Sequence, residues 1–415
     1  MSIAVKYGVS VERICADNGL SPETELVVGQ DIVILVPLSV YTVKSEDTLF
    51  EISERSGVGV YKLLQNNPSL MGRTEIYPGQ TIVLSEEQPL LGEISVGGFA
   101  YTYIDEDSLR SALPYLTYLS VFSYGITEDG TLIEPENDER LILAAREYGT
   151  VPLLVLTSLN SQGVFSSELV NSVLSDETLS SRVKASLIET VKGKGYGGVD
   201  FDFEYIRADL SAEYARLIRE VRDELGRDYT VFCDLAPKTS GDMEGLLYEA
   251  HDYPMLGSAA TKLFLMTYEW GYSYGPPMAV SPVENVRRVI EYGVSTIPPE
   301  KLFMGIPAYG YDWKLPYVKG EGRAQTLSSV EAVELAQQVG AEIMFDNVSM
   351  APYFNYTDTG GAKHEVWFQN ARSIEALSRL AAEYTLDGIT VWNLMRYFPS
   401  LWAALRGLYS FKKLK

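Results

Sequence analysis

The feature that most restricts the fold of this 415-residue chain is a regular alternation of strand-like and helix-like segments, from about residue 93 to the end. Eight apolar segments have the length and the flanking turns of buried strands, and amphipathic stretches separate them. Eight strand–helix units predict an α/β fold, the (β/α)8 or TIM barrel. The expected strands are Ile94–Tyr101, Tyr118–Tyr124, Val151–Thr157, Gly198–Glu204, Thr230–Ala236, Lys262–Tyr268, Leu302–Ala308 and Gly388–Asn393. The clearest expected helices are Glu139–Tyr148, Leu179–Lys192, Ala212–Leu225, Val283–Tyr292 and Ser373–Tyr384.

A further segment, at about 314–365, interrupts the alternation after the seventh strand. It carries a helical pattern of its own and short strand-like pieces, so it predicts a small α+β insertion. The barrel with this insertion is expected to span 93–415. The pieces are a helix at Ser328–Val339 and strands at Ile343–Asp346, Ala351–Tyr356 and Glu365–Phe368.

The fourth expected strand carries acidic residues at three alternate positions, Asp200, Asp202 and Glu204. Successive side chains of a strand point to opposite faces, so these carboxylates share one face of an otherwise apolar strand. Each ionised carboxylate makes ionisation of the next one harder, and burial adds to this effect, so at least one proton is retained near neutral pH. A retained proton beside ionised carboxylates suits general acid catalysis. A solvated polar face, or a site for a hard divalent cation, would also explain the pattern.

The spacing of these acids resembles the DxxDxDxE motif of the family 18 glycoside hydrolases, the chitinase-like enzymes. Asp200, Asp202 and Glu204 match its last three positions, and Gly197 stands where the family has its first Asp. That first Asp is the member farthest from the chemistry, so its absence bears on tuning more than on activity. The family commonly carries an α+β insertion after the seventh strand, where it forms one wall of the cleft.

Residues at the ends of the sixth and eighth strands extend this resemblance. Met266 and Tyr268 alternate onto one face, and their stretch resembles the family's MxYD sequence with Glu269 in place of Asp. Trp392 matches the tryptophan of the family's barrel floor. The resemblance implies that these side chains bind the sugar. Packing in the barrel core is the alternative for Met266, Tyr268 and Trp392.

The resemblance also implies a mechanism. No second carboxylate on an opposing strand is evident as a nucleophile, and family 18 enzymes are an exception to the usual two-carboxylate scheme. In them the acetamido oxygen of the sugar attacks its own anomeric carbon and forms an oxazolinium. Glu204 would protonate the glycosidic oxygen and later activate water, Asp202 would orient the acetamido group, and Asp200 would share a proton with Asp202. The Tyr268 hydroxyl would hold the acetamido oxygen, and Trp392 would stack beneath the sugar. No metal and no cofactor are expected.

Residues 1–85 contain an internal repeat. Asn18 corresponds to Asn67, 49 positions later, and Gly29 corresponds to Gly79 with one residue inserted. Each unit is expected to form two short helices followed by a strand, and only the second unit has an opening strand. The expected strands are Ile32–Val36 in the first unit, and Val40–Lys44 and Thr81–Leu84 in the second.

The second unit resembles the LysM module, a small βααβ domain that binds polymers of N-acetylglucosamine. Modules are expected at 1–37 and 39–85. The first begins without an opening strand and turn, so we expect it to be a truncated or degenerate copy, and packing without sugar binding is the alternative for both. The resemblance rests on Tyr41-Thr-Val-Lys, Asp47-Thr-Leu, Asn66-Asn-Pro and Pro78-Gly-Gln, and it implies sugar contacts from Asp47, Thr48, Asn67 and Pro78.

Charge and cysteine content argue against several classes of function. The chain has 34 basic and 56 acidic residues, a net charge of −22, which argues against nucleic acid and anionic membranes as partners. Cys15 and Cys233 lie far apart, each in an apolar run, so buried free thiols are expected rather than a disulfide. Only two histidines occur, so acid–base chemistry rests mainly on carboxylates and tyrosines. We expect neither a membrane span nor a signal peptide.

LysM units before a family 18 barrel, with Met-Thr-Tyr-Glu-Trp-Gly-Tyr at 266–272, resemble the cortex-lytic N-acetylglucosaminidases of endospore-forming bacteria. This implies hydrolysis of β-1,4 bonds at N-acetylglucosamine in peptidoglycan, as spore cortex or its fragments. It also implies synthesis in the mother-cell cytoplasm and a location at the cortex, coat or wall. We expect a monomer. A chitinase, a catalytically silent lectin of this fold and a structural coat protein are the rival interpretations. A GxSxG match at Gly271–Gly275 precedes two prolines instead of a helix, which disfavours a serine hydrolase.

Overall fold

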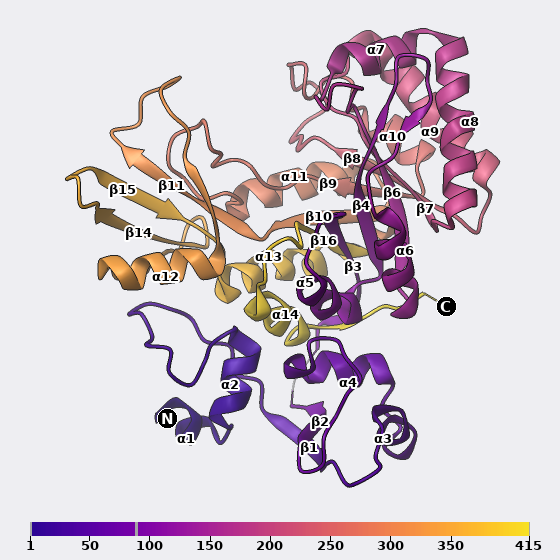
Figure 1. Cartoon of the computed structure of the whole chain (residues 1–415). Helices are drawn as coiled ribbons and strands as arrows, with labels where there is room; N and C mark the ends of the chain where they lie inside the picture. Colours follow the sequence, from indigo (N-terminus) through magenta and orange to yellow (C-terminus); the bar gives the residue numbers. More distant parts are fainter. Residues whose placement is uncertain (1, 88–89, 415) are drawn as a thin grey trace.

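The computed structural model describes residues 2–87 and 90–414, and its main part is a closed barrel of parallel strands (Figure 1). The strands, in order around the ring, are β3 (Gly92–Tyr101), β4 (Tyr118–Ile126), β6 (Val151–Thr157), β7 (Gly198–Asp202), β8 (Thr230–Leu235), β9 (Lys262–Leu265), β10 (Leu302–Pro307) and β16 (Gly388–Trp392). The ring closes because β3 pairs in parallel with both β4 and β16. The predicted (β/α)8 fold class and all eight expected barrel strands are confirmed.

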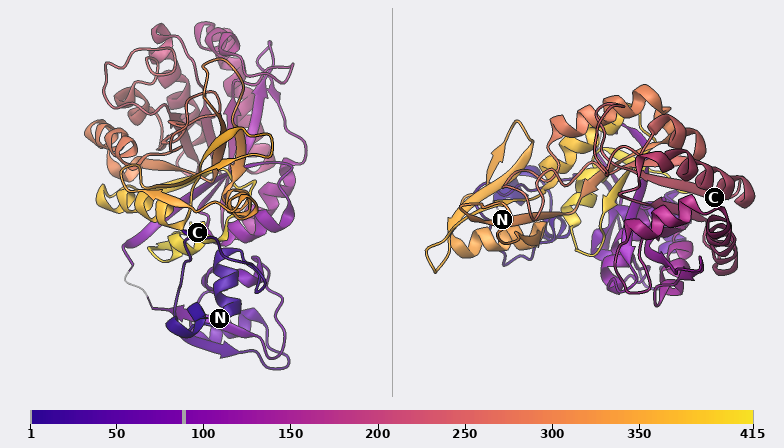
Figure 2. Two further views of the ribbon diagram at one scale, coloured as in Figure 1. Left: turned by 90° about the vertical axis from the view of Figure 1, so that its left-hand side faces the viewer. Right: turned by 90° about the horizontal axis from the view of Figure 1, so that it is seen from above.

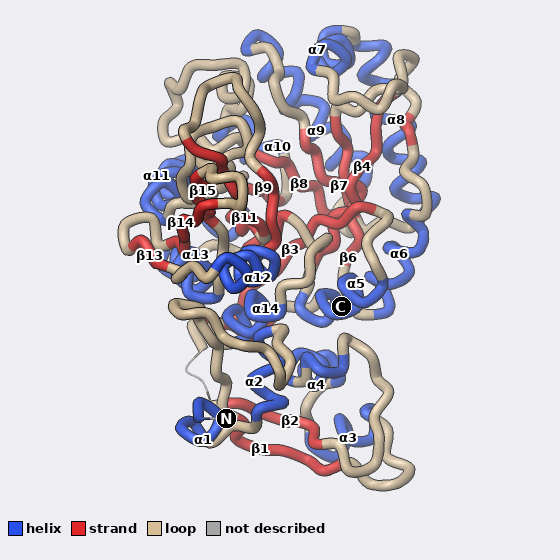
Figure 3. The backbone as a smooth tube through the Cα atoms, turned by 60° about the vertical axis from the view of Figure 1, so that its left-hand side comes forward, coloured by secondary structure: helices blue, strands red, loops and turns tan. Residues whose placement is uncertain are grey.

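Helices cover the outside of the ring (Figure 3). Seen from above, they surround the strands on the side away from the insertion (Figure 2, right). The five expected helices correspond to α6, α8, α9, α11 and α13, with ends that differ by at most a few residues. The helices are α5 (Glu106–Ala112), α6 (Asp138–Glu147), α7 (Ser167–Ser175), α8 (Glu177–Lys194), α9 (Ser211–Leu225), α10 (Tyr253–Ala259), α11 (Val283–Thr296), α13 (Ala371–Glu383) and α14 (Pro399–Arg406), and the short strands β5 (Leu132–Ile133) and β17 (Tyr409–Phe411) flank the barrel.

Alternation along the strands separates two apolar layers. Val199 and Phe201 of β7 belong to the core between strands and helices, whereas Asp200 lies on the other face, inside the ring. The interior is filled largely by aromatic rings, and those of Phe232 and Phe303 lie 5.0 Å apart. The barrel is therefore a packed core, and an active site has room only at its mouth.

Two barrel strands end earlier than predicted. The fourth, β7, ends at Asp202 instead of Glu204, and the chain turns there because Tyr205 adopts φ 56°. The sixth, β9, ends at Leu265 instead of Tyr268, and Glu269 has φ 66°. At both positions the polar residues at the strand's carboxyl end leave the ladder, so they stand on turns at the mouth of the barrel.

The insertion after the seventh strand is larger than predicted. It begins at Tyr309 instead of about residue 314, and two of its strands, β11 and β12, were not expected. Its five strands form an antiparallel sheet in the order β12-β11-β15-β14-β13, which projects from the barrel beside α12 (Figure 1). The elements are β11 (Tyr309–Leu315), β12 (Gln325–Ser328), α12 (Ser329–Val339), β13 (Met344–Asp346), β14 (Ala351–Thr357) and β15 (Lys363–Trp367).

The N-terminal repeats lie beneath the barrel (Figures 1 and 2). The two helices of each unit are present. The prediction of a strand at Ile32–Val36 is wrong, because the described residues contain no opening strand in the first unit for it to pair with. The second unit has that pair, β1 with β2, in antiparallel register. The elements are α1 (Ser2–Tyr7) and α2 (Val11–Asn18), then β1 (Pro37–Thr42), α3 (Leu49–Ser56), α4 (Val60–Asn66) and β2 (Thr81–Glu86).

The same asparagine contact holds each repeat together. Asn18 exchanges hydrogen bonds with the backbone of Val33, its Nδ2 donating to the carbonyl and its Oδ1 accepting from the amide, both at 2.8 Å. Asn67 makes the same pair with Val83, at 2.9 and 2.8 Å. The repeat recognised in the sequence is thus a repeat in structure, even though the first copy has no strand pair.

The repeats are attached to the amino ends of the barrel strands. Gln65 donates to the carbonyl of Pro114, just before β4, at 2.8 Å, and the Tyr148 hydroxyl, before β6, donates to the carbonyl of Gly72 at 2.7 Å. No helix among residues 2–87 and 90–414 is long and apolar enough to cross a bilayer. Both cysteines are free; Cys233 is buried, as predicted, whereas Cys15 is only half-buried.

Candidate active site

The innermost acid of the row is Asp200, which points into the barrel and is buried. The hydroxyl of Ser120, on β4 across the interior, donates a hydrogen bond to its Oδ2 at 3.0 Å. Burial raises the pKa of Asp200 to about 6, although hydrogen bonds from Asp234 and Ser120 work in the opposite direction. Asp200 is therefore able to exchange a proton near neutral pH.

Asp202 lies two residues farther along the same face. Its Oδ1 is enclosed and has no hydrogen-bond partner among the described residues. Burial, followed by repulsion from Glu204 and Asp200, holds the pKa of Asp202 well above its usual range. An enclosed carboxyl without a donor is suited to accept one from a bound substrate, such as the N–H of an acetamido group.

Glu204 follows the end of β7 and is half-buried at the mouth. Burial raises its pKa, which favours the protonated form that a general acid needs. Buried His251 fixes the backbone at Phe203, the residue just before Glu204. Its Nδ1 accepts a hydrogen bond from the amide of Ala236 at 2.9 Å, so this nitrogen carries no proton. The other ring nitrogen, Nε2, then donates to the carbonyl of Phe203 at 3.1 Å. Burial lowers the pKa of His251 to about 4, so the ring is neutral and acts as a fixed link between the ends of β7 and β8.

Tyr268 and Trp392 face each other at the mouth. Their ring centroids are 6.4 Å apart with nearly parallel planes, 16° between them. Trp392 also packs edge-on against Phe99 and Phe122 of the barrel interior, and Met266 borders the same cluster. Burial and the nearby acids Asp234, Asp202 and Glu204 hold the pKa of Tyr268 well above its usual range, so its hydroxyl remains a donor.

Glu269 connects the barrel mouth to the insertion. One carboxylate oxygen, Oε1, accepts hydrogen bonds from the hydroxyls of Tyr309 and Tyr311, the latter at 2.8 Å. Both tyrosines lie on β11, one of the strands that were not predicted. Glu269 is therefore held against the insertion, where this carboxylate can still meet sugar hydroxyls at the edge of the site.

Asp234 is a fourth acid of the site that the sequence reading missed. It lies on β8 beside β7, is buried, and donates a hydrogen bond to the Asp200 carboxylate. Burial and the charges of Asp200 and Asp202 hold its pKa well above the usual range. Asp234 lies on the strand adjacent to β7 and is buried, so it supports Asp200 and is not the opposing nucleophile whose absence was expected. The sequence did contain a signal for this acid. Asp234 is the single acid in the apolar run Val231–Leu235, and it lies two residues after Phe232, so alternation along the strand puts it on the same inward face.

The residues expected to bind sugar in the second repeat lie apart from these acids, in the region that meets the opposite end of the barrel. Asp47 is held by the backbone amide of Lys44 and by Arg55, and Thr48 caps α3 through a reciprocal pair with Glu51. Asn67 is buried and its amide is used by the backbone of its own repeat. Sugar binding by Asp47, Thr48, Asn67 and Pro78 stays a prediction, and for Asn67 the contacts describe a structural role.

The site can hold and transfer protons without a cation beside it. Asp200, Asp202, Glu204 and Asp234 form no ion pair with lysine or arginine within the described part of the chain. No group of three or more His, Cys, Asp or Glu residues in that part is arranged to hold a metal ion. A half-buried acid at the mouth, an enclosed acid beneath it and a tyrosine hydroxyl beside both suit acid-assisted cleavage of a bond at an acetamido sugar.

Comparison with known proteins agrees with this geometry. Residues 102–396 match the Glycosyl hydrolases family 18, and residues 2–35 and 41–85 match the LysM domain. The cortical fragment-lytic enzyme of Bacillus anthracis is 36% identical over 97% of this chain and 94% of its own length. That of Bacillus subtilis (strain 168) is 41% identical over 74% of this chain and 71% of its own length.

A solved structure also matches nearly the whole chain. The crystal structure of the Bacillus cereus spore cortex-lytic enzyme SleL superposes with a TM-score of 0.84 at 36% identity, covering 99% of this chain and 96% of that one. The similarity extends over both the barrel and the N-terminal region, so it is not limited to a common barrel fold. The chain therefore belongs to the glycosyl hydrolases of family 18, and is a glycoside hydrolase with an N-terminal LysM region.

Proposed function

We propose that this enzyme hydrolyses β-1,4 bonds at N-acetylglucosamine in spore cortex peptidoglycan or its fragments, by a substrate-assisted retaining mechanism. The observation that carries the mechanism is the enclosed, unpartnered Oδ1 of Asp202 beside Glu204 and Tyr268. A carboxyl in that position accepts the N–H of the sugar's acetamido group and turns its carbonyl oxygen toward the anomeric carbon. The sugar then supplies its own nucleophile.

Each acid has a distinct part in the reaction. Glu204 gives its proton to the glycosidic oxygen as the bond to the anomeric carbon breaks, and an oxazolinium ring forms. Asp202 balances the positive charge of that ring, and Asp200 takes up the change in proton sharing, supported by Asp234. The ionised Glu204 then removes a proton from water, which opens the ring with overall retention.

Aromatic and polar groups position the substrate. Trp392 stacks beneath the sugar, the Tyr268 hydroxyl donates to the acetamido oxygen, and Met266 fills the space below the ring. Glu269 accepts from sugar hydroxyls at the side of the insertion. Because Tyr268 and Trp392 are nearly parallel, both present a flat face to the same site.

The choice of peptidoglycan over chitin rests on the relatives, whose names specify cortical fragments and spore cortex. We further propose that the protein acts at the spore cortex, coat or wall, as a monomer, and that the second LysM module, at 39–85, attaches it to glycan. Attachment raises the local substrate concentration without new contacts at Glu204.

Two assays test the proposal. Release of product from cortex fragments that contain muramic lactam is compared with release from chitin oligomers of equal length. A faster rate on the cortex fragments is expected, and a faster rate on chitin oligomers would make this a chitinase. Separately, a thiazoline mimic of the oxazolinium should inhibit competitively, and more weakly in Asp202→Asn. An active enzyme that the thiazoline does not inhibit would contradict substrate assistance.

A further inference from the structure

Two loops meet beside the active site and are joined by hydrogen bonds. The first loop, residues 271–275, follows β9, and the second, residues 316–324, connects β11 to β12 of the insertion. The amide of Ala324 in the second loop donates to the carbonyl of Ser273 in the first at 2.8 Å. Another bond, from the Tyr317 hydroxyl to a carbonyl of the first loop, is 2.9 Å long. The barrel therefore holds this loop of the insertion in a fixed position.

Arg323, in the second loop, lies at the edge of the proposed sugar site. Its neighbour Ala324 is buried in an apolar cluster with the two tyrosines that hold Glu269. The rings of Tyr268 and Trp392 border the same cluster. Arg323 itself is exposed, so its charge lies on the solvent side of the cluster, next to the mouth of the barrel.

The Arg323 guanidinium is held over an aromatic ring and has no carboxylate partner. Its central carbon lies 5.5 Å from the ring centroid of Tyr274, in the joined loop. Within the described part of the chain no acid forms an ion pair with it. Burial raises the pKa of Glu269, whereas hydrogen bonds from the two tyrosines and the charge of Arg323 lower it. The charge of Arg323 therefore reaches the edge of the site and remains available to a ligand.

The rest of the site is acidic, so Arg323 changes what it can bind. The chain has a net charge of −22, which repels an anionic polymer at long range. A cation at the rim offsets this repulsion locally and attracts an anionic group of the substrate. The acids are Asp200, Asp202, Glu204, Asp234 and Glu269.

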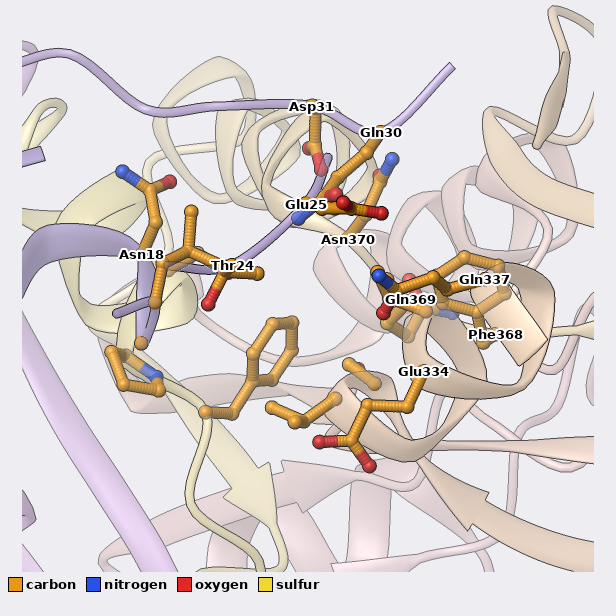
Figure 4. A pocket seen from close by; sticks show the side chains of 18 residues that line it. Asn18, Thr24, Glu25, Gln30, Asp31, Glu334, Gln337, Phe368, Gln369 and Asn370 are labelled. Atoms are coloured by element: carbon orange, nitrogen blue, oxygen red, sulfur yellow. The ribbon is translucent and has the colours of Figure 1, made fainter. Parts of the chain in front are cut away.

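Other hollows of the protein offer an anion less. The pocket between the first repeat and the barrel is lined by carboxylates such as Glu25 and Glu334, and none of its described lining residues is basic (Figure 4). Two further hollows do have basic side chains in their linings, but each of these is in an ion pair. They are Arg73, Arg110, Arg140 and Lys194.

The proposed substrate differs from chitin in its charge. A muramic residue of peptidoglycan carries a lactyl group, which ends in a carboxylate or in a peptide with carboxylates of its own, unless it has closed to a lactam. Chitin has no such group. A guanidinium binds a carboxylate through two parallel N–H bonds, which an uncharged sugar cannot replace. A guanidinium already held on a ring loses less freedom when it makes these bonds.

We propose that Arg323 is a specificity residue, which binds the carboxylate of a muramic residue next to the N-acetylglucosamine that lies over Trp392. The proposal rests on the proposed function, because muramic residues occur in peptidoglycan and not in chitin. Tyr274 fixes the guanidinium, and the joined loops fix both side chains beside Glu269. Lactam residues, which lack the carboxylate, pass the rim without this contact.

The test compares two forms of one ligand on the full chain, with Glu204→Gln present in every protein to prevent turnover. The ligand is a tetrasaccharide of alternating N-acetylglucosamine and N-acetylmuramic acid, and in the second form its carboxylates are converted to methylamides. Calorimetry gives the ratio of the two affinities, carboxylate form over amide form. We expect Arg323→Gln to lower this ratio about tenfold. Arg323→Lys, which keeps the charge without the two parallel bonds, should lower it about threefold.

Lys319→Gln is the matched control, because it removes the same charge from an exposed position of the same loop. Its ratio should equal that of the parent. Equal ratios in the parent and Arg323→Gln, an equal drop in Lys319→Gln, or no measurable binding of the carboxylate form to the parent would each overturn the proposal. Added salt should reduce the difference between the parent and Arg323→Gln, since the contact is exposed.

Failure of the proposed function is seen separately. In that case the chain with Glu204 intact leaves cortex fragments uncut, while the affinity ratios still decide the role of Arg323. Thermal unfolding shows whether each variant is folded, and the exposed position of Arg323 predicts unfolding near the parent temperature.

Discussion

Two groups of buried acids in this protein differ in what lies opposite them. In the barrel, Asp200 and Asp234 are buried without an ion pair to any described lysine or arginine. Between the repeats and the barrel, Asp17 and Glu86 face arginines instead. Arg406, which is only 1% exposed, contacts Asp17 at 2.6 Å and Glu86 at 3.0 Å.

The difference separates acids that can exchange protons in the reaction from acids that stabilise the interface between the repeats and the barrel. A buried carboxylate next to a buried arginine keeps its charge and fixes an interface. A buried carboxylate next to other carboxylates has a raised pKa and keeps a proton available for chemistry. The comparison therefore distinguishes the active site from the joint, the interface of Asp17, Glu86 and Arg406 between the repeats and the barrel, on physical grounds alone. It can be tested by removing one group from each cluster.

The largest effect is expected at the barrel mouth. Glu204→Gln keeps the shape of the side chain but removes its titratable proton, so kcat on cortex fragments should fall by about 10²–10⁴-fold. Binding of the protein to sedimented cortex should not change, because the acid is not needed for attachment. A loss of less than about tenfold on a substrate with an unactivated leaving group would mean that another residue is the acid.

The joint between repeats and barrel should respond through stability. Arg406→Met removes one cation from Asp17 and Glu86 and keeps their ion pairs with Arg13, so the free energy of unfolding should fall by about 3–5 kcal/mol. Urea unfolding measures this change, and kcat of the folded protein on soluble fragments should be unaffected.

Arg379→Met is the matched control for the joint, because its pair with Glu375 lies on the surface. Surface pairs are worth about 0–1 kcal/mol, so this variant should unfold close to the parent. Equal losses in Arg406→Met and Arg379→Met would show that the buried arginine cluster does not stabilise the joint.

Asp200 should make the native state less stable as the pH rises. The ordinary pKa of an aspartate is 3.8, and burial raises the pKa of Asp200 to about 6 in the fold, so the carboxyl ionises at lower pH in the unfolded chain. The stability that its protonated form provides is complete below about pH 4 and is lost as the pH rises to about 6, by roughly 1–3 kcal/mol. Asp200→Asn should flatten this part of the curve of unfolding free energy against pH. An unchanged slope between pH 4 and 6.5 would mean that another group titrates there.

The smallest effect concerns Asp234. Asp234→Leu removes the hydrogen bond that lowers the pKa of Asp200, so that pKa should rise and the acidic limb of the pH–rate profile should move up by about one pH unit. Asp234→Asn can still donate to Asp200, so its limb should stay close to the parent. Identical pH–rate profiles for Asp234→Leu and Asp234→Asn would show that Asp234 does not share a proton with Asp200.

The elements of the barrel could be predicted because they follow local periodicity. Residues 198–202 read as a strand from alternation alone, and the same alternation placed Asp200 and Asp202 on one inward face. Glu204 was predicted as the acid although β7 ends before it, since one turn beyond the strand still leaves it at the mouth. The resemblance to family 18 added the roles of Tyr268 and Trp392, which alternation by itself could not distinguish from core packing.

The sequence by itself determined the barrel, the repeats and the inward row of acids, because strand and helix periods depend on neighbours in the chain. Only the tertiary structure decided which distant residues support that row. Ser120 from β4 and Asp234 from β8 contact Asp200, and His251 links the ends of β7 and β8. It also decided that 32–36 forms no strand, since a ladder needs a partner. The contact between the first repeat and the insertion, where the amide of Ile343 donates to the carbonyl of Val28, joins segments more than 300 residues apart, and no local pattern records it.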